Sequence, residues 1–138
     1  MANIDKISYS ASDNFRLARS KTLYDLADGT YNLIQLPKFA FVDQVWFYIS
    51  QAYAGGAAGA ATIGWTGNAT TADPDGFMDA TQAGARATGM KVMTGDTQPG
   101  SQGKWFDSGS GCVTITLAKS TDTTLLRGFV FVRFSVLH

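Results

Sequence analysis

A run of branched and aromatic residues at positions 36–53 most constrains the fold of this 138-residue chain. The run reads LPKFAFVDQVWFYISQAY, and Pro37 and Lys38 place a turn near its start. Such side chains are enriched in β-strands, and their density on both faces is typical of a strand in the middle of a sheet. We therefore expect a central strand here, either continuous or divided near Asp43-Gln44.

Two later segments alternate with the period of two that a β-strand requires. Residues 112–118 carry apolar side chains on one face and threonines on the other, and residues 128–137, GFVFVRFSVL, alternate in the same way. The second face of the last segment is also apolar at its start, because Phe129 and Phe131 lie there. A two-layer sandwich covers only one face of each sheet, so we expect Phe129 and Phe131 to form an interface with another segment or another subunit.

The composition favours strands and turns over helices. All 11 acidic residues are aspartates, and threonine and glycine are frequent. We predict an all-β fold, an antiparallel β-sandwich of jelly-roll-like or Greek-key type, with an incomplete barrel as the alternative. Residues 1–30 are expected to form an extended N-terminal arm and residues 31–138 a single sandwich domain.

A loop and a turn are expected between these strands. Residues 52–61, AYAGGAAGAA, predict either a mobile hairpin loop or a place where another backbone comes close. The sequence Asp73-Pro74-Asp75-Gly76 predicts a turn. One short helix is expected over residues 77–83, ending at Gly84.

The residues needed for catalysis are scarce. Cys112 is the only cysteine, and His138 is the only histidine and the last residue. No phosphate-binding or dinucleotide-binding fingerprint is present. We therefore expect no catalytic site and no cofactor.

The net charge is zero, so we expect no nucleic acid as a partner. The sequence has no apolar segment of bilayer length, so we expect no membrane as a partner.

Three groups of residues are candidates for binding. Asp73, Asp75 and Asp79 could offer oxygens to calcium, or could instead cap a turn and the start of a short helix. Three aromatic residues are expected either to form a platform for a ligand or to pack in the core and between subunits. These residues are Tyr53, Trp65 and Trp105. Isolated apolar residues in the arm are expected at an interface, and these are Ile4 and Ile7.

Three segments have the form of strands joined by specific turns. Residues 31–38, YNLIQLPK, lead into Val45-Trp46; residues 63–65, IGW, are followed by ADPDGFMD at 72–79; and residues 128–132, GFVFV, begin the final strand. In these segments the chain resembles small β-sandwich virion structural proteins of tailed bacteriophages. The resemblance covers residues 31–89 and 112–137.

This resemblance implies a non-enzymatic subunit of a phage particle, made in the host cytoplasm and located in the phage head. The chain is short for a major capsid subunit, so we expect a capsid decoration, or cement, protein. It would form a homotrimer and contact the major capsid protein, with the arm as a tether. The alternatives are a sugar- or receptor-binding module of a head or tail fibre and a neck or tail connector subunit.

Overall fold

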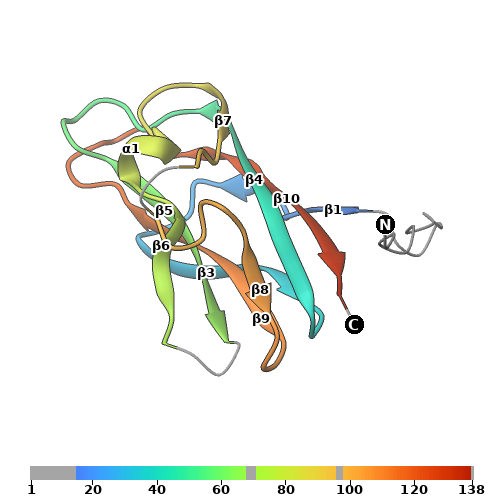
Figure 1. Ribbon diagram of the computed structural model, residues 1–138. Helices are drawn as coiled ribbons and strands as arrows, with labels where there is room; N and C mark the ends of the chain where they lie inside the picture. The colour runs from blue at the N-terminus through green and yellow to red at the C-terminus, as the bar shows by residue number, and fades with distance from the viewer. Residues whose placement is uncertain (1–14, 68–70, 96–97, 138) are drawn as a thin grey trace, which may run out of the picture.

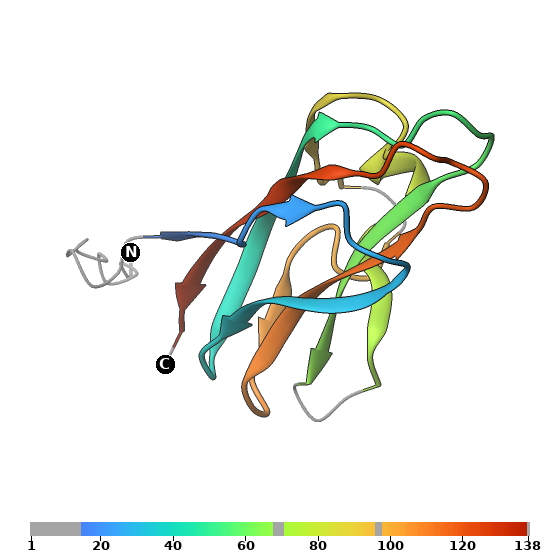
Figure 2. The same ribbon diagram turned by 180° about the vertical axis from the view of Figure 1, so that it is seen from behind.

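The chain forms two antiparallel β-sheets packed face to face (Figures 1 and 2). The computed structural model describes residues 15–67, 71–95 and 98–137. Sheet A contains β1 (Arg16–Arg19), β2 (Leu23–Tyr24), β4 (Ala40–Gln51), β7 (Gly89–Val92), β8 (Lys104–Phe106) and β10 (Arg127–Val136). Sheet B contains β3 (Gly29–Leu36), β5 (Ala60–Gly67), β6 (Asp73–Met78) and β9 (Gly111–Ala118), and one short helix, α1 (Ala80–Ala83), follows β6.

The strand order links the two sheets through crossing connections. Sheet A has the order β1-β10-β4-β7, with β2 paired to β10 and β8 to β4, and sheet B has the order β3-β9-β5-β6. Successive strands therefore pass from one sheet to the other, except for the β5–β6 hairpin and the neighbouring strands β1–β2 and β7–β8. This arrangement confirms the predicted all-β fold, an antiparallel sandwich of two sheets.

The predicted central strand is β4, and it is continuous. It pairs with β10 along its length, and the register shifts where Arg133 faces Gln44 but the next residue, Phe134, faces Val42. The residue skipped by this bulge is Asp43, which is where a division of the strand was considered. A bulge changes the direction of a side chain, and here the Asp43 carboxylate accepts hydrogen bonds from Arg133.

The core lies between the sheets and consists of the inward residues of the alternating strands. Burial alternates along β10 as the sequence predicts, and it also alternates along most of β4, which was expected to be packed on both faces. Strand β9 is buried along nearly its whole length. The fully buried side chains of these three strands include Val45, Phe47, Ile49, Val113, Ile115, Val130 and Val132. Burial of a large apolar side chain stabilises a fold by about 1.5–3 kcal/mol, so these rows stabilise the contact between the two layers.

The segment at 73–83 differs from its prediction. Residues 73–76 are part of strand β6 instead of a turn, and Pro74 is tolerated because β6 lies at the edge of sheet B, where one side needs no hydrogen bonds. The helix is correspondingly shorter and begins after Asp79, whose carboxylate accepts a hydrogen bond from the Gln82 backbone. Its predicted end is correct, because Gly84 closes it in the left-handed conformation with φ of 52°.

Part of the predicted arm belongs to the sheets. Strands β1 and β2 pair with β10, and β3 already begins at Gly29. Residues 1–14, with Ile4 and Ile7, lie outside the described residues, and their tethering role stays a prediction.

Candidate functional site

The candidate site is the outer face of sheet A, the side turned away from sheet B. Residues directly opposite one another in neighbouring strands share a face. Phe131 lies opposite Trp46 of β4 and Arg19 of β1, and Trp46 lies opposite Val92 of β7. The resulting continuous surface is called the aromatic face below, and it comprises Leu17, Arg19, Trp46, Tyr48, Met90, Val92, Phe129, Phe131 and Arg133.

Large apolar side chains on this surface remain open to solvent. The exposed fraction is 66% for Leu17, 49% for Met90 and 42% for Val92. Phe15 and Tyr24 extend the exposed surface at the β1 and β2 edge. Single exposed apolar residues are normal, but a contiguous group of this kind marks an interaction surface.

The rings at the centre of the aromatic face pack against one another and are half-buried. The ring centroid of Phe129 lies 5.2 Å from that of Tyr48 and 5.1 Å from that of Phe131. The guanidinium of Arg19 lies 5.2 Å from the Phe129 centroid, within the range of a cation–π contact. Phe129 and Phe131 therefore lie on the aromatic face, and their role at an interface stays a prediction.

Two other arginines of sheet A are held by aspartates. Arg133 lies 2.8 Å from the Asp43 carboxylate and Arg127 lies 2.9 Å from that of Asp25. The hydrogen bond and charge of Asp43 raise the pKa of Arg133, and the hydrogen bond from Arg127 lowers the pKa of Asp25. Arg19 is in none of the three ion pairs formed within the described chain, so its charge is available to a partner.

A small cavity opens in the aromatic face. It has a volume of about 180 Å³, and we call it the apolar slot; its lining residues are Leu17, Trp46, Met90 and Phe131. Apolar protein cavities of about 150 Å³ accept a molecule as large as benzene. The apolar slot is therefore large enough for one aliphatic or aromatic side chain.

The outer face of sheet B has the opposite character. Thr116 of β9 lies opposite Thr30 of β3 and Thr62 of β5. The hydroxyl oxygens of Thr30 and Thr116 are 2.9 Å apart and share a hydrogen bond. We call this surface the threonine face, with Thr30, Asn32, Gln35, Thr62, Thr114 and Thr116 as its polar members.

The three residues proposed as a ligand platform are not brought together as one exposed surface. Tyr53 and Trp65 are buried, with 1% and 5% of their surface exposed, whereas Trp105 is 47% exposed. The Trp65 ring packs edge-on against Phe77 at 5.0 Å, and Lys104 lies 4.9 Å from its centroid. Burial also raises the pKa of Tyr53 to about 12. Core packing is the role that these contacts support for Tyr53 and Trp65.

The three aspartates considered for calcium are also separated in their roles. Asp79 caps α1 and accepts a second hydrogen bond, of 2.8 Å, from Gln98. Asp73 and Asp75 lie on β6, and burial together with the neighbouring Asp75 raises the pKa of Asp73. Among the residues described, no three acidic, histidine or cysteine side chains converge on a point where a metal ion could bind.

One of the two scarce reactive residues lies in the described part of the chain. Cys112 is buried on β9, and burial raises the pKa of its thiol. His138 lies outside the described residues. In the described ranges, no helix has the length and apolar character needed to cross a bilayer.

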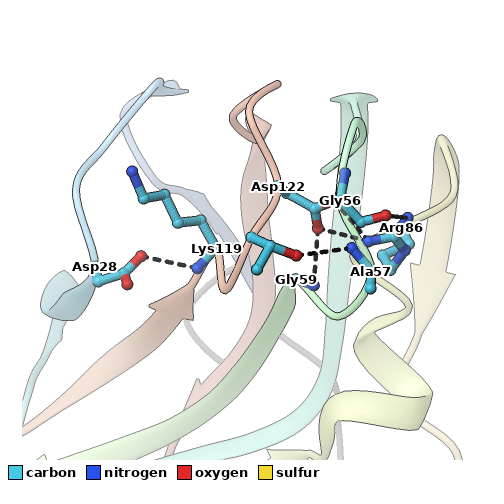
Figure 3. A network of polar contacts seen from close by, with 8 residues as sticks. Asp28, Gly56, Ala57, Gly59, Arg86, Lys119 and Asp122 are labelled. Carbon is cyan, nitrogen blue, oxygen red and sulfur yellow. Dashed lines mark hydrogen bonds and ion pairs between the residues drawn. The ribbon is translucent and has the colours of Figure 1, made fainter.

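Sequence reasoning missed one polar site at the end of the sandwich (Figure 3). The carboxylate of Asp122 is fully buried and accepts hydrogen bonds of 2.8 Å from the backbones of Gly56 and Gly59. Arg86 donates to the same carboxylate at 2.6 and 2.7 Å. Burial alone would raise the pKa of Asp122, but the hydrogen bonds from Arg86, Gly56 and Gly59 outweigh it, and the pKa is lowered.

This site decides between the two expectations for residues 52–61. A Cβ atom at Gly56 would collide with the backbone of Thr121, and one at Gly59 with Asp122 and Tyr53. Gly56 is therefore needed because another backbone comes close, as one of the two predictions states, and Gly59 is needed because two side chains come close. The signal in the sequence was the glycine spacing, but its acidic partner lies more than sixty residues away.

Comparison with known proteins finds similarity only at the level of structure. The sequence matches no family model and no curated protein. A chain of the structure described as the cyanophage Pam1 capsid asymmetric unit has a TM-score of 0.71 at 15% identity, covering 99% of this chain and 94% of that one. A chain of the acid-stable capsid of Helicobacter pylori bacteriophage KHP30 has a TM-score of 0.61 at 16% identity, covering 87% and 86%. At such identities the likeness shows a shared fold.

Proposed function

We propose that this chain is a structural protein of a phage particle, and more specifically a decoration protein that stabilises the capsid. The observation that carries the proposal is the aromatic face, because a single copy leaves Leu17, Met90 and Val92 exposed beside a row of packed rings. Burial of apolar area contributes about 25 cal/mol per Å². A stable interface buries about 800 Å² per partner, so a face of this character is suited to subunit contacts.

The two structural neighbours support the location. Both belong to structures described as phage capsids. In each case the aligned part covers nearly equal shares of the two chains, so the similar chains have about the length of this one. The likeness is therefore between whole small chains, which favours an accessory subunit over a large shell subunit.

The proposed partners are copies of the chain, as a homotrimer, and the major capsid protein. The aromatic face offers rings, aliphatic side chains and arginines, which suit contact with protein. We propose no catalytic activity and no cofactor for this surface. The protein would be made in the host cytoplasm and then become part of the phage head.

The test is to count copies of the chain in purified virions of the phage that encodes it. Hundreds of copies are expected of a decoration protein, and removal of these copies should lower the stability of the capsid. A dozen or fewer would contradict decoration and would point to a connector or a fibre. Reproducible binding of the purified chain on a glycan array would favour a receptor-binding module instead.

A further inference from the structure

We propose that the apolar slot is occupied by Ile7 of a second copy, so that copies exchange their N-terminal segments. This inference rests on the proposed function, because it assigns an occupant to the aromatic face. Within the described chain the slot is open, and its four lining residues come from β1, β4, β7 and β10. Its volume of about 180 Å³ suits one branched aliphatic side chain.

Strand β1 begins at the edge of sheet A. Arg16 lies opposite Phe134 and Arg19 opposite Phe131, so β1 starts beside the last part of β10. Both ribbon views place β1 at the edge of the molecule, next to β10 (Figures 1 and 2). Fourteen residues precede Phe15. In extended form Ile7 lies about 26 Å from Phe15, against a width of about 19 Å for four strands, so a neighbouring copy is within reach.

The segment has the chemistry that the slot requires. It reads MANIDKISYSASDN, with Ile7 as an apolar residue and Asp5 two positions before it. In an extended chain these two side chains would point to the same side, about 6.6 Å apart. Arg19 lies opposite Phe131, which lines the slot, and has no ion pair among the described residues. Ile7 in the slot would therefore bring Asp5 near an available cation.

A second copy also satisfies the stoichiometry. Every chain has one slot and one N-terminal segment, so each copy gives and receives one contact. Such a head-to-tail contact closes into a ring when the rotation between copies allows it. The proposed homotrimer is an arrangement of this kind.

The experiment uses full-length chains with engineered cysteines. Chains carrying Ile7→Cys and Met90→Cys, one of them with a tag that changes its size, are co-expressed, oxidised mildly and separated without reductant. We expect a disulfide between the two different chains, since a side chain in the slot lies within disulfide reach of Met90. The native Cys112 is buried and remains in place.

The matched control replaces Met90→Cys by Thr62→Cys on the threonine face, and cross-linking should then fall at least about tenfold. The double variant, Ile7→Cys with Met90→Cys, is also co-expressed with an excess of wild-type chain. A disulfide formed within one chain would overturn the exchange between copies. The absence of any Ile7 cross-link to Met90 would overturn the occupant itself.

A second measurement avoids dependence on disulfide chemistry. Ile7→Asp should weaken association of the chains at least about tenfold, and Ser8→Asp, on the other side of an extended segment, should change it less than threefold. Equal effects would contradict the proposal. Binding to capsids is measured separately: chains that fail to cross-link but still coat particles refute only the exchange. Chains that cross-link but never bind particles refute only the decoration role.

Discussion

The two outer faces of the sandwich occupy equivalent places in the fold and have opposite surfaces. On the threonine face, the hydroxyls of Thr30 and Thr116 share a hydrogen bond. On the aromatic face, the same alternation places Phe131, Trp46 and Leu17 outward. The buried core consists mainly of inward side chains of the two sheets, and this outer row is not part of that core. The difference shows that the aromatic face is suited to a contact outside the single chain.

The largest loss of association is expected when a charge is placed at the apolar slot, and this variant tests whether the two faces differ in function. Phe131→Asp places a carboxylate in an apolar contact, where it loses hydration without gaining a partner. We expect association to weaken about 30-fold or more, measured by sedimentation velocity, because central aromatic residues dominate interfaces. Thr62→Asp is the matched control and should cost less than threefold. Similar losses for both variants would show that the faces do not differ in function.

A second prediction separates folding from association, because it changes neither face. Asp122→Asn removes the charge that binds Arg86 and the two glycine backbones, and we expect the melting temperature to fall by on the order of 10 °C. Thermal unfolding followed by circular dichroism measures it, with the exposed Asp107→Asn as control. If folded Asp122→Asn associates much more weakly than wild type, the network also serves the interface, and the comparison is incomplete.

The same variant has a defined pH dependence. The pKa of Asp122 is lowered in the folded chain, whereas an unfolded aspartate has a pKa of about 3.9. Its stabilising effect is therefore complete above that value and is lost as the pH falls through the lower folded pKa. The difference in melting temperature between wild type and Asp122→Asn should stay constant from about pH 7 to 5 and narrow below about pH 4. A difference that widens in acid would contradict this sign.

A smaller loss of association is expected at the edge of the aromatic face. Leu17 is 66% exposed in one copy, so Leu17→Ser should change the melting temperature by less than about 2 °C. The same variant should weaken association about tenfold, because the leucine side chain becomes buried only in the contact. Calorimetry and sedimentation measure the two quantities. Loss of stability without loss of association would mean that Leu17 serves the fold.

The smallest effect is expected on the threonine face. Thr116→Val removes one member of the hydroxyl pair but leaves Thr30 accessible to water, so little hydrogen bonding is lost. We expect the melting temperature to change by less than about 3 °C and the association constant by less than twofold. A strong loss of association here would move the interface to sheet B.

Alternation along the chain was enough to predict the sandwich and the outward position of Phe129 and Phe131. It could not predict that Leu17, Trp46 and Met90 join Phe131 at one slot. That requires the pairing of four strands that are distant in sequence. The sequence suggested this surface, but its extent depends on the register between strands.

Two other differences have local causes. Pro74 and Gly76 were interpreted as a turn because turn residues cluster there, but an edge strand also accepts them. Trp65 shares its strand face with Ile63, and this alternation would have placed it in the core, whereas aromatic character alone suggested a platform. The pairing of Arg86 with Asp122 had no signal beyond the glycines at 56 and 59.

Oxidation of methionine by peroxide tests the role of the aromatic face most directly. Met90 is 49% exposed in one copy, whereas Met78 and Met93 are buried and provide an internal reference. In assembled particles we predict that Met90 oxidises as slowly as these two, and at least about tenfold faster in dissociated subunits, as followed by mass spectrometry. Equal and rapid oxidation of Met90 in both forms would show that the face stays open in the particle and would contradict the proposed role.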